Sequence, residues 1–151
     1  LYKERLQRLY DMMVVVAVAI ALPTVFLSNA VVEFLYGQAF AQAGDVLAIH
    51  IWSSAFIFVG VSAGKWTLAE NLQKLALYRT AAGAFVNVIG NFMLIPYWGI
   101  NGAAVATLLS QIVAAYLGYS FCKETRLNFY MQTKALFGIS ILDRIVRATR
   151  N

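Results

Sequence analysis

The sequence is dominated by one uncharged stretch, which runs for 43 residues over positions 80–122. A bilayer core about 30 Å thick is crossed by about 20 helical residues, so this stretch is too long for one span and long enough for two. Residues 96–102 lie near its middle and contain one proline and two glycines, which end helices and permit tight turns. The stretch therefore predicts a transmembrane hairpin with spans over 75–95 and 102–122.

The sequence motifs of this hairpin also resemble those of a known protein family. Its elements are Asn87 and Asn91 on one helix face, Leu94-Ile95-Pro96, Gly99, the segment Gly-Ala-Ala-Val-Ala-Thr at 102–107, and Ser110. The pattern resembles the C-terminal half of polysaccharide-biosynthesis flippases, the O-antigen and lipid-linked oligosaccharide exporters of the multidrug/oligosaccharidyl-lipid/polysaccharide superfamily. The resemblance runs from about residue 37 to residue 122.

The composition favours a membrane protein throughout. Hydrophobic residues make up 61% of the chain and the mean hydropathy is +0.69, whereas a soluble domain is about half apolar. Two further apolar runs, at 12–32 and 45–64, are also long enough to span. We therefore predict an all-α integral membrane fold with four transmembrane helices plus interfacial amphipathic helices.

Three local patterns lie outside the hairpin. Pro23 falls inside the first span, where it is expected to kink the helix or end its regular part. Residues 65–79 are polar enough to predict a loop, whose flanks can be helical, between the second and third spans. Residues 132–150 alternate apolar and charged positions with helical spacing, which predicts an amphipathic tail at the membrane surface. The first residue is leucine, so we expect residues 1–151 to be the C-terminal fragment of a larger exporter bundle.

The basic residues are sorted along the chain. Of the 12 Lys and Arg residues, three precede the first span, three lie within residues 65–79 and six follow the fourth span. Basic residues favour the cytoplasmic side, so both ends are predicted to be cytoplasmic in an inner (cytoplasmic) membrane. The net charge of +5 is therefore explained by topology, and no nucleic-acid partner is predicted.

No enzyme constellation is visible. The chain has one His and one Cys, and it lacks paired metal ligands and a phosphate-cradling glycine loop. We predict no catalytic residue, metal or cofactor, and we expect a transport site that is completed by the remaining transmembrane helices of a longer protein.

Polar residues inside spans carry the candidate site, because a central charge costs about 2.5–3.5 kcal/mol on insertion scales and tends to face cavities. Each also has a structural alternative: cations can anchor the membrane surface, amides can join helices, and a histidine near the interface can be hydrated. The substrate-binding candidates are Lys65, Arg79, Asn87, Asn91 and Gln111, and the proton-coupling candidates are His50 and Asp45.

The resemblance implies a function as well as a fold. It implies export of a polyprenyl-pyrophosphate-linked oligosaccharide across the cytoplasmic membrane by alternating access, for O-antigen, lipopolysaccharide or related polysaccharide biosynthesis. The partners would be the bilayer and the lipid-linked oligosaccharide, with basic residues facing the pyrophosphate. Two alternatives are a cation-coupled multidrug exporter of the same superfamily and a membrane scaffold without transport activity.

Overall fold

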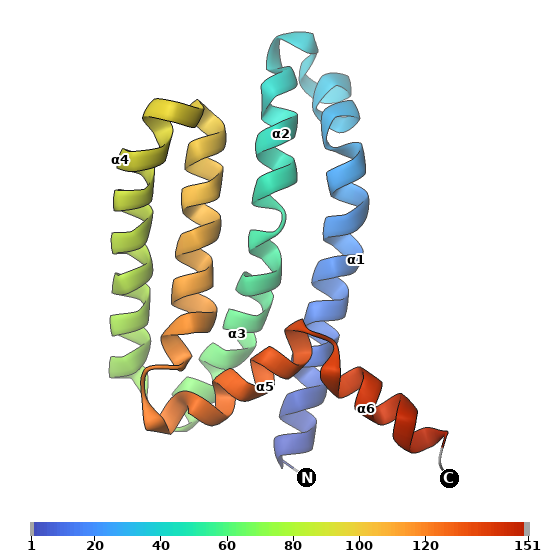
Figure 1. The fold of residues 1–151 in the computed structure, drawn as a ribbon, viewed down its shortest axis with the longest axis vertical. Coiled ribbons are helices and arrows are strands. Elements are labelled where there is room, and N and C mark those ends of the chain that lie inside the picture. The colour runs from blue at the N-terminus through green and yellow to red at the C-terminus, as the bar shows by residue number, and fades with distance from the viewer. Residues whose placement is uncertain (1, 150–151) are drawn as a thin grey trace.

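The computed structural model describes residues 2–149, with the side chains at 144, 145, 147 and 148 left aside, and every regular element within that range is helical. Long helices stand side by side, and two shorter ones lie across the lower end (Figure 1). The principal helices are α1 (Tyr2–Tyr36), α2 (Ala41–His50), α3 (Ser53–Ala69), α4 (Gln73–Gln111), α5 (Arg126–Leu136) and α6 (Ile139–Ala148).

Helix α1 contains the predicted span at 12–32 and extends beyond it at both ends. The expectation that Pro23 ends the regular part is wrong, because the helix continues through it to Tyr36. It ends where Gly37 adopts a φ of 82°, a conformation that glycine reaches without steric cost, and the Gly37 amide donates to the Glu33 carbonyl at 2.8 Å.

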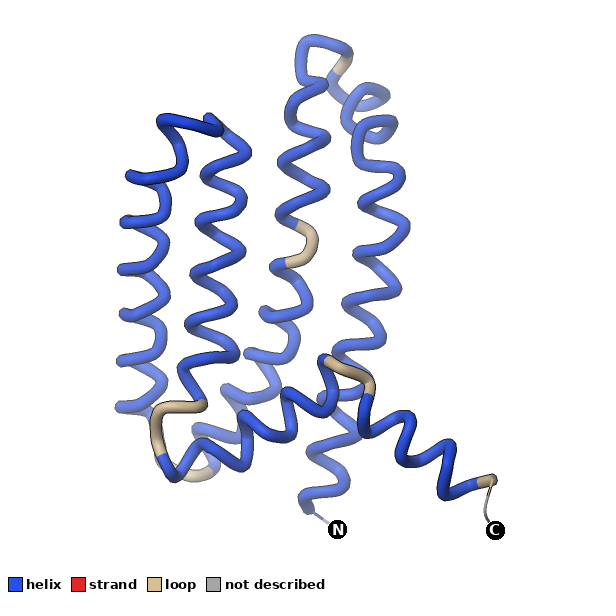
Figure 2. The backbone as a smooth tube through the Cα atoms, viewed as in Figure 1, coloured by secondary structure: helices blue, strands red, loops and turns tan. Residues whose placement is uncertain are grey.

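The predicted span at 45–64 is not one straight helix. It is divided at residues 51–52, and the two parts, which run over 38–50 and 53–69, are bent by 42° (Figure 2). Within the predicted link at 65–79 both flanks are helical, because α3 continues to Ala69 and α4 begins at Gln73. Only a short turn separates them, with Asn71 at a φ of 57°.

Helix α4 folds back on itself at Gly99, whose φ of 54° and ψ of −132° lie outside the helical region. Its two limbs then run antiparallel, as the yellow and orange ribbons of Figure 1 show. The second limb continues past Gln111 into a π-helical turn at Ile112–Tyr116 and a 3₁₀ turn at Leu117–Tyr119. The predicted hairpin is present, with its reversal inside the expected segment at 96–102.

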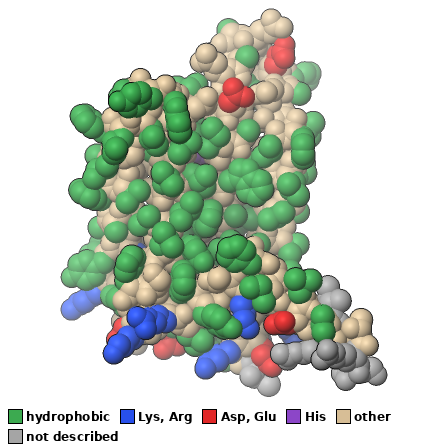
Figure 3. Space-filling model, viewed as in Figure 1, with side chains coloured by type: hydrophobic (Ala, Val, Ile, Leu, Met, Phe, Trp, Pro, Cys, Tyr) green, Lys and Arg blue, Asp and Glu red, His purple; other side chains and the backbone are tan. Residues whose placement is uncertain are grey.

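The structure gives two or three candidate membrane spans, where the sequence predicts four. Tyr2–Tyr36 and Gln73–Tyr119 are long and apolar enough to cross a membrane, and the bent pair of α2 and α3 makes a third if it counts as one span. Large apolar side chains cover much of the face seen in Figure 3. Over the whole surface, the exposed apolar side chains include Phe34, which is 89% exposed, and Phe92, which is 84% exposed. Such a surface is unfavourable in water and fits lipid or further helices.

The tail crosses the lower end of the bundle as two helices. The prediction of one helix over 132–150 is wrong, because Gly138 adopts a φ of 66° between α5 and α6; residue 150 itself lies outside the described range. Helix α5 packs into the main core, which joins α1, α3, the end of the hairpin and the tail. The buried members of this core are Tyr10, Val14, Val59, Ala63, Trp66, Tyr119, Met131 and Ala135.

Candidate functional site

Small residues hold the two limbs of α4 together. A Cβ placed on Gly83 would lie 2.6 Å from the Cβ of Ala114, and one placed on Gly90 would lie 3.0 Å from the Cβ of Ala106. Close approach of backbones is what small residues allow in membrane helices. The small-residue face of the second limb therefore packs against the first limb. Its small residues are Gly102, Ala106, Ser110, Ala114 and Gly118.

An amide and hydroxyl chain crosses the same interface. Asn91 donates from Nδ2 to Oδ1 of Asn87 at 3.0 Å, and Asn87 donates from Nδ2 to Oγ1 of Thr107 at 3.4 Å. Thr107 in turn donates to the Ala103 carbonyl at 3.0 Å. Oδ1 of Asn91 is buried and has no hydrogen-bond partner among the described residues. Asn87 thus bonds across the two limbs, whereas Asn91 bonds to Asn87 within its own limb and keeps one acceptor without a partner among the described residues.

Arg79 closes the base of the hairpin. Its Nη1 donates to the Ala114 carbonyl at 3.0 Å, and its guanidinium carbon lies 3.6 Å from the centre of the Tyr119 ring. The hydroxyl of Tyr119 lies 3.2 Å from Oγ1 of Thr67 on α3, within hydrogen-bond distance. Arg79 therefore links both limbs of α4, and Tyr119 extends the link to α3.

The π-helical turn at Ile112–Tyr116 surrounds the carbonyl that Arg79 uses. A change from α-helical to π-helical register leaves some backbone carbonyls without an N–H donor in the same helix. Such a carbonyl can then accept a hydrogen bond from a side chain. Gly118 completes the fit, because a Cβ there would lie 2.6 Å from Cγ of Arg79.

A groove of about 680 Å³ lies between α3 and the α4 hairpin. Three of the substrate-binding candidates line it: Arg79, Asn87 and Gln111. Thr107 and Ser110 add hydroxyl groups, and glycines and alanines form most of the remaining wall. The groove thus presents one guanidinium and several neutral hydrogen-bonding groups in otherwise apolar surroundings.

The other candidates lie apart from this groove. Lys65 is exposed and follows Gly64, which lines the groove. Asn91 does not line the groove, but it donates a hydrogen bond to Asn87, which does. Asp45 and His50 are both exposed on α2, and within residues 2–149 neither side chain forms a hydrogen bond or ion pair. The structure therefore does not bring the two proton-coupling candidates to the substrate-binding candidates.

A buried polar cluster where the tail meets α1 was not predicted. Tyr10 donates from its hydroxyl to Oδ1 of Asn128 at 2.5 Å, and Gln132 donates to the same oxygen at 3.0 Å. Ser140 donates to Oδ1 of Asp11, which also accepts from Gln7 at 3.0 Å. The spacing of Asn128 and Gln132, four residues apart on one helix face, was the only sequence signal for it.

The groove presents hydrogen-bonding groups that can contact a polar ligand. No group of three or more His, Cys, Asp or Glu side chains among the described residues is placed to hold a metal ion. Fold and groove together define a helical membrane protein in which polar side chains line a cleft between closely packed helices.

Sequence comparison adds two relatives. The chain is 28% identical over 132 residues to the capsular polysaccharide biosynthesis protein CapF of Staphylococcus aureus, covering 82% of this chain and 33% of CapF. It is 36% identical over 90 residues to the probable low-salt glycan biosynthesis flippase Agl15 of Haloferax volcanii, covering 60% of this chain and 19% of Agl15. No protein-family profile and no solved structure matches. The chain therefore has weak homology to the polysaccharide-biosynthesis flippase family, which confirms the resemblance, and it spans a third or less of the relatives' lengths.

Proposed function

We propose that this chain is the C-terminal transmembrane part of a flippase that exports a polyprenyl-pyrophosphate-linked oligosaccharide across the cytoplasmic membrane. The observation that carries the proposal is the groove beside α4, where Arg79, Asn87 and Gln111 face one cavity in a chain similar to two glycan-biosynthesis proteins. The similarity to a flippase favours transport over catalysis. The resemblance implies a lipid-linked oligosaccharide as a class and does not name a particular glycan.

We further propose four spans with both ends in the cytoplasm. The reversal at Gly99 supports counting the two limbs of α4 separately, since each is about 30–40 Å long at about 1.5 Å per residue. The bent pair of α2 and α3 and the whole of α1 supply the other two spans. The basic residues that flank these elements support the orientation.

In this proposal, different residues in and beside the groove contact different parts of the substrate. Amides and hydroxyls suit the many hydroxyl groups of a glycan, because a buried polar group needs a partner. Lys65, exposed next to Gly64 and without an ion-pair partner among the described residues, offers its charge to the pyrophosphate. Arg79 lines the groove and contributes through the guanidinium donors that it does not use on the Ala114 carbonyl. Asp45 and His50 remain the candidates for proton coupling, on α2.

The test replaces Lys65 by Gln and Gln111 by Ala in the full-length protein. Surface polysaccharide is measured in cells that lack the native protein, and each value is divided by the abundance of the variant. Lys74→Gln is the matched control, because Lys74 is also exposed but, unlike Lys65, it is not next in sequence to a residue that lines the groove. We expect export to fall about fivefold or more in both test variants, the ratio that corresponds to about 1 kcal/mol. Normal export in both would remove the groove from the transport path.

A further inference from the structure

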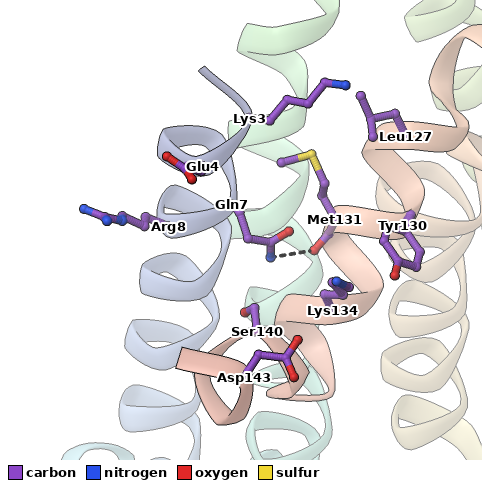
Figure 4. Close-up of a pocket in the computed structure, with 10 residues that line it drawn as sticks. All are labelled: Lys3, Glu4, Gln7, Arg8, Leu127, Tyr130, Met131, Lys134, Ser140 and Asp143. Carbon is purple, nitrogen blue, oxygen red and sulfur yellow. Dashed lines mark hydrogen bonds between the residues drawn. The ribbon is translucent and has the colours of Figure 1, made fainter. Parts of the chain in front are cut away.

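A second cavity lies between the first turns of α1 and the two tail helices (Figure 4). Its volume is about 450 Å³, against about 30 Å³ for a water molecule in the liquid. Helix α1 contributes Lys3 and Gln7, α5 contributes Tyr130 and Lys134, and α6 contributes Asp143. The cavity shares no lining residue with the groove beside α4.

Hydrogen bonds between the surrounding helices hold this cavity open in a fixed shape. Gln7 donates from Nε2 to the Met131 carbonyl at 3.0 Å, which ties α1 to α5. Ser140 donates to Asp11, which ties α6 to α1. Met131, Ser140 and Asp11 are all buried, so the floor is a packed surface and not a gap between mobile side chains. A binding site that is already shaped loses less entropy when it is occupied.

Charges of both signs line the cavity. Among the described residues, neither Lys3 nor Asp143 forms a hydrogen bond or an ion pair, and the ammonium of Lys134 only lies 4.8 Å from the centre of the Tyr130 ring. Glu4, at the outer edge, is engaged in another interaction. Among the described residues, the ammonium groups of Lys3 and Lys134 and the carboxylate of Asp143 thus line one space without an ion-pair partner, and the guanidinium of Arg8 lines it too.

The position of this cavity decides what can reach it. It lies on α5 and α6, and the tail also exposes Phe137, Ile139, Leu142 and Val146. A helix pair that exposes large apolar side chains beside charged ones lies in the interface, with its polar face at the depth of the lipid head groups. Basic side chains gather near the tail on the face seen in Figure 3. Head groups are therefore the most abundant charged molecules around the cavity.

We propose that this cavity binds the head group of a phospholipid with a primary amine, the phosphoethanolamine group. The phosphate lies between the ammonium groups of Lys3 and Lys134, and the amine of the head group donates to the carboxylate of Asp143. Both charges of the ligand are then matched by charges of opposite sign. A phosphocholine head group has no N–H to donate to Asp143, and a phosphoglycerol head group has no cation to place against it.

The test measures which lipids stay bound to the full chain. The protein is incubated with equimolar palmitoyl-oleoyl phosphatidylethanolamine, phosphatidylcholine and phosphatidylglycerol, and retained lipids are counted by native mass spectrometry. We expect phosphatidylethanolamine to be retained about fivefold over each of the other two. The double variant Lys3→Gln/Lys134→Gln should lose this preference, and Asp143→Asn should shift it toward phosphatidylglycerol.

The control carries the same change of charge elsewhere. Lys74→Gln/Lys123→Gln removes two exposed lysines that do not line the cavity, and it should retain the wild-type preference. Circular dichroism checks that all variants keep their helical content. Equal retention of the three lipids by the wild type, or equal losses in the test and control variants, would overturn the proposal. Soluble phosphoethanolamine should compete with the lipid; its binding without any lipid preference would exclude the membrane as the source and overturn the proposal too.

Discussion

Replacement of Arg79 tests whether one guanidinium holds the base of the α4 hairpin together. The variant Arg79→Gln loses a charged hydrogen bond to the Ala114 carbonyl, worth about 1.5–3 kcal/mol, and a cation–π contact with Tyr119, worth about 0.5–2 kcal/mol. Arg79 is half-buried, so solvent replaces part of both contacts. We therefore expect the free energy of unfolding to fall by about 2–3 kcal/mol.

The assay is equilibrium unfolding of the purified chain by sodium dodecyl sulfate in mixed micelles, followed by circular dichroism. A double-mutant cycle with Tyr119→Leu isolates the ring contact, and its coupling energy should be about 1 kcal/mol. Arg79→Lys should fall between the wild type and Arg79→Gln, because an ammonium keeps the ring contact but lacks the planar fork. A loss below about 0.5 kcal/mol for Arg79→Gln, or a coupling energy of zero, would refute the structural role derived for this residue.

Three further changes test other parts of the fold. Gly83→Val should destabilise the hairpin by about 1–3 kcal/mol, because the Cβ of the new side chain would lie 2.6 Å from the Cβ of Ala114. Gly64→Ala is its control: a Cβ at that position has no atom within 4 Å, so the variant should be neutral or stabilising in the same unfolding assay. Tyr10→Phe removes the 2.5 Å hydrogen bond to Asn128 and should lower the stability of α5 by about 1–3 kcal/mol, measured as faster hydrogen exchange in that helix. Unchanged exchange would show that this bond does not hold α5 against α1. Gly99→Ala imposes a side chain on a φ of 54° and should lower the unfolding midpoint by the equivalent of about 1–3 kcal/mol.

The hairpin was predictable because its signals are local. Proline and glycine mark the reversal, and small residues at every fourth position mark the face that packs. Antiparallel pairing around Gly99 then places Asn87 opposite Thr107, so these two polar groups meet as a consequence of the turn alone. That part of the candidate groove follows from the sequence.

Other features depend on tertiary contacts that no local sequence pattern predicts. The break at residues 51–52 contains neither glycine nor proline, so the run at 45–64 reads as continuous. The contact of Arg79 with the Ala114 carbonyl depends on a π-helical turn that has no sequence signature here. Charge patterning identifies Arg79 as a cation near the cytoplasmic surface but cannot tell a residue that faces the groove from one that braces the hairpin.

The tail illustrates the same limit over longer distances. Its hydrogen bonds to α1 join residues 118 and 129 positions apart in the chain. Amphipathic spacing correctly placed helix in residues 132–150, but the break at Gly138 and the pinning of α5 follow from packing against α1, which a periodic pattern does not contain.

The π-helical turn at Ile112–Tyr116 has a consequence for length variation in relatives. A π turn holds one more residue than an α turn between the same two points along the axis, which is how a single inserted residue is absorbed inside a helix. Deletion of one residue from this turn should restore α-helical register and keep both flanking segments in phase. The same deletion near Gly90 would rotate everything after it by about 100° and turn the small-residue face away from its partner. Gaps in an alignment of homologues should therefore gather at this turn and avoid the rest of the hairpin.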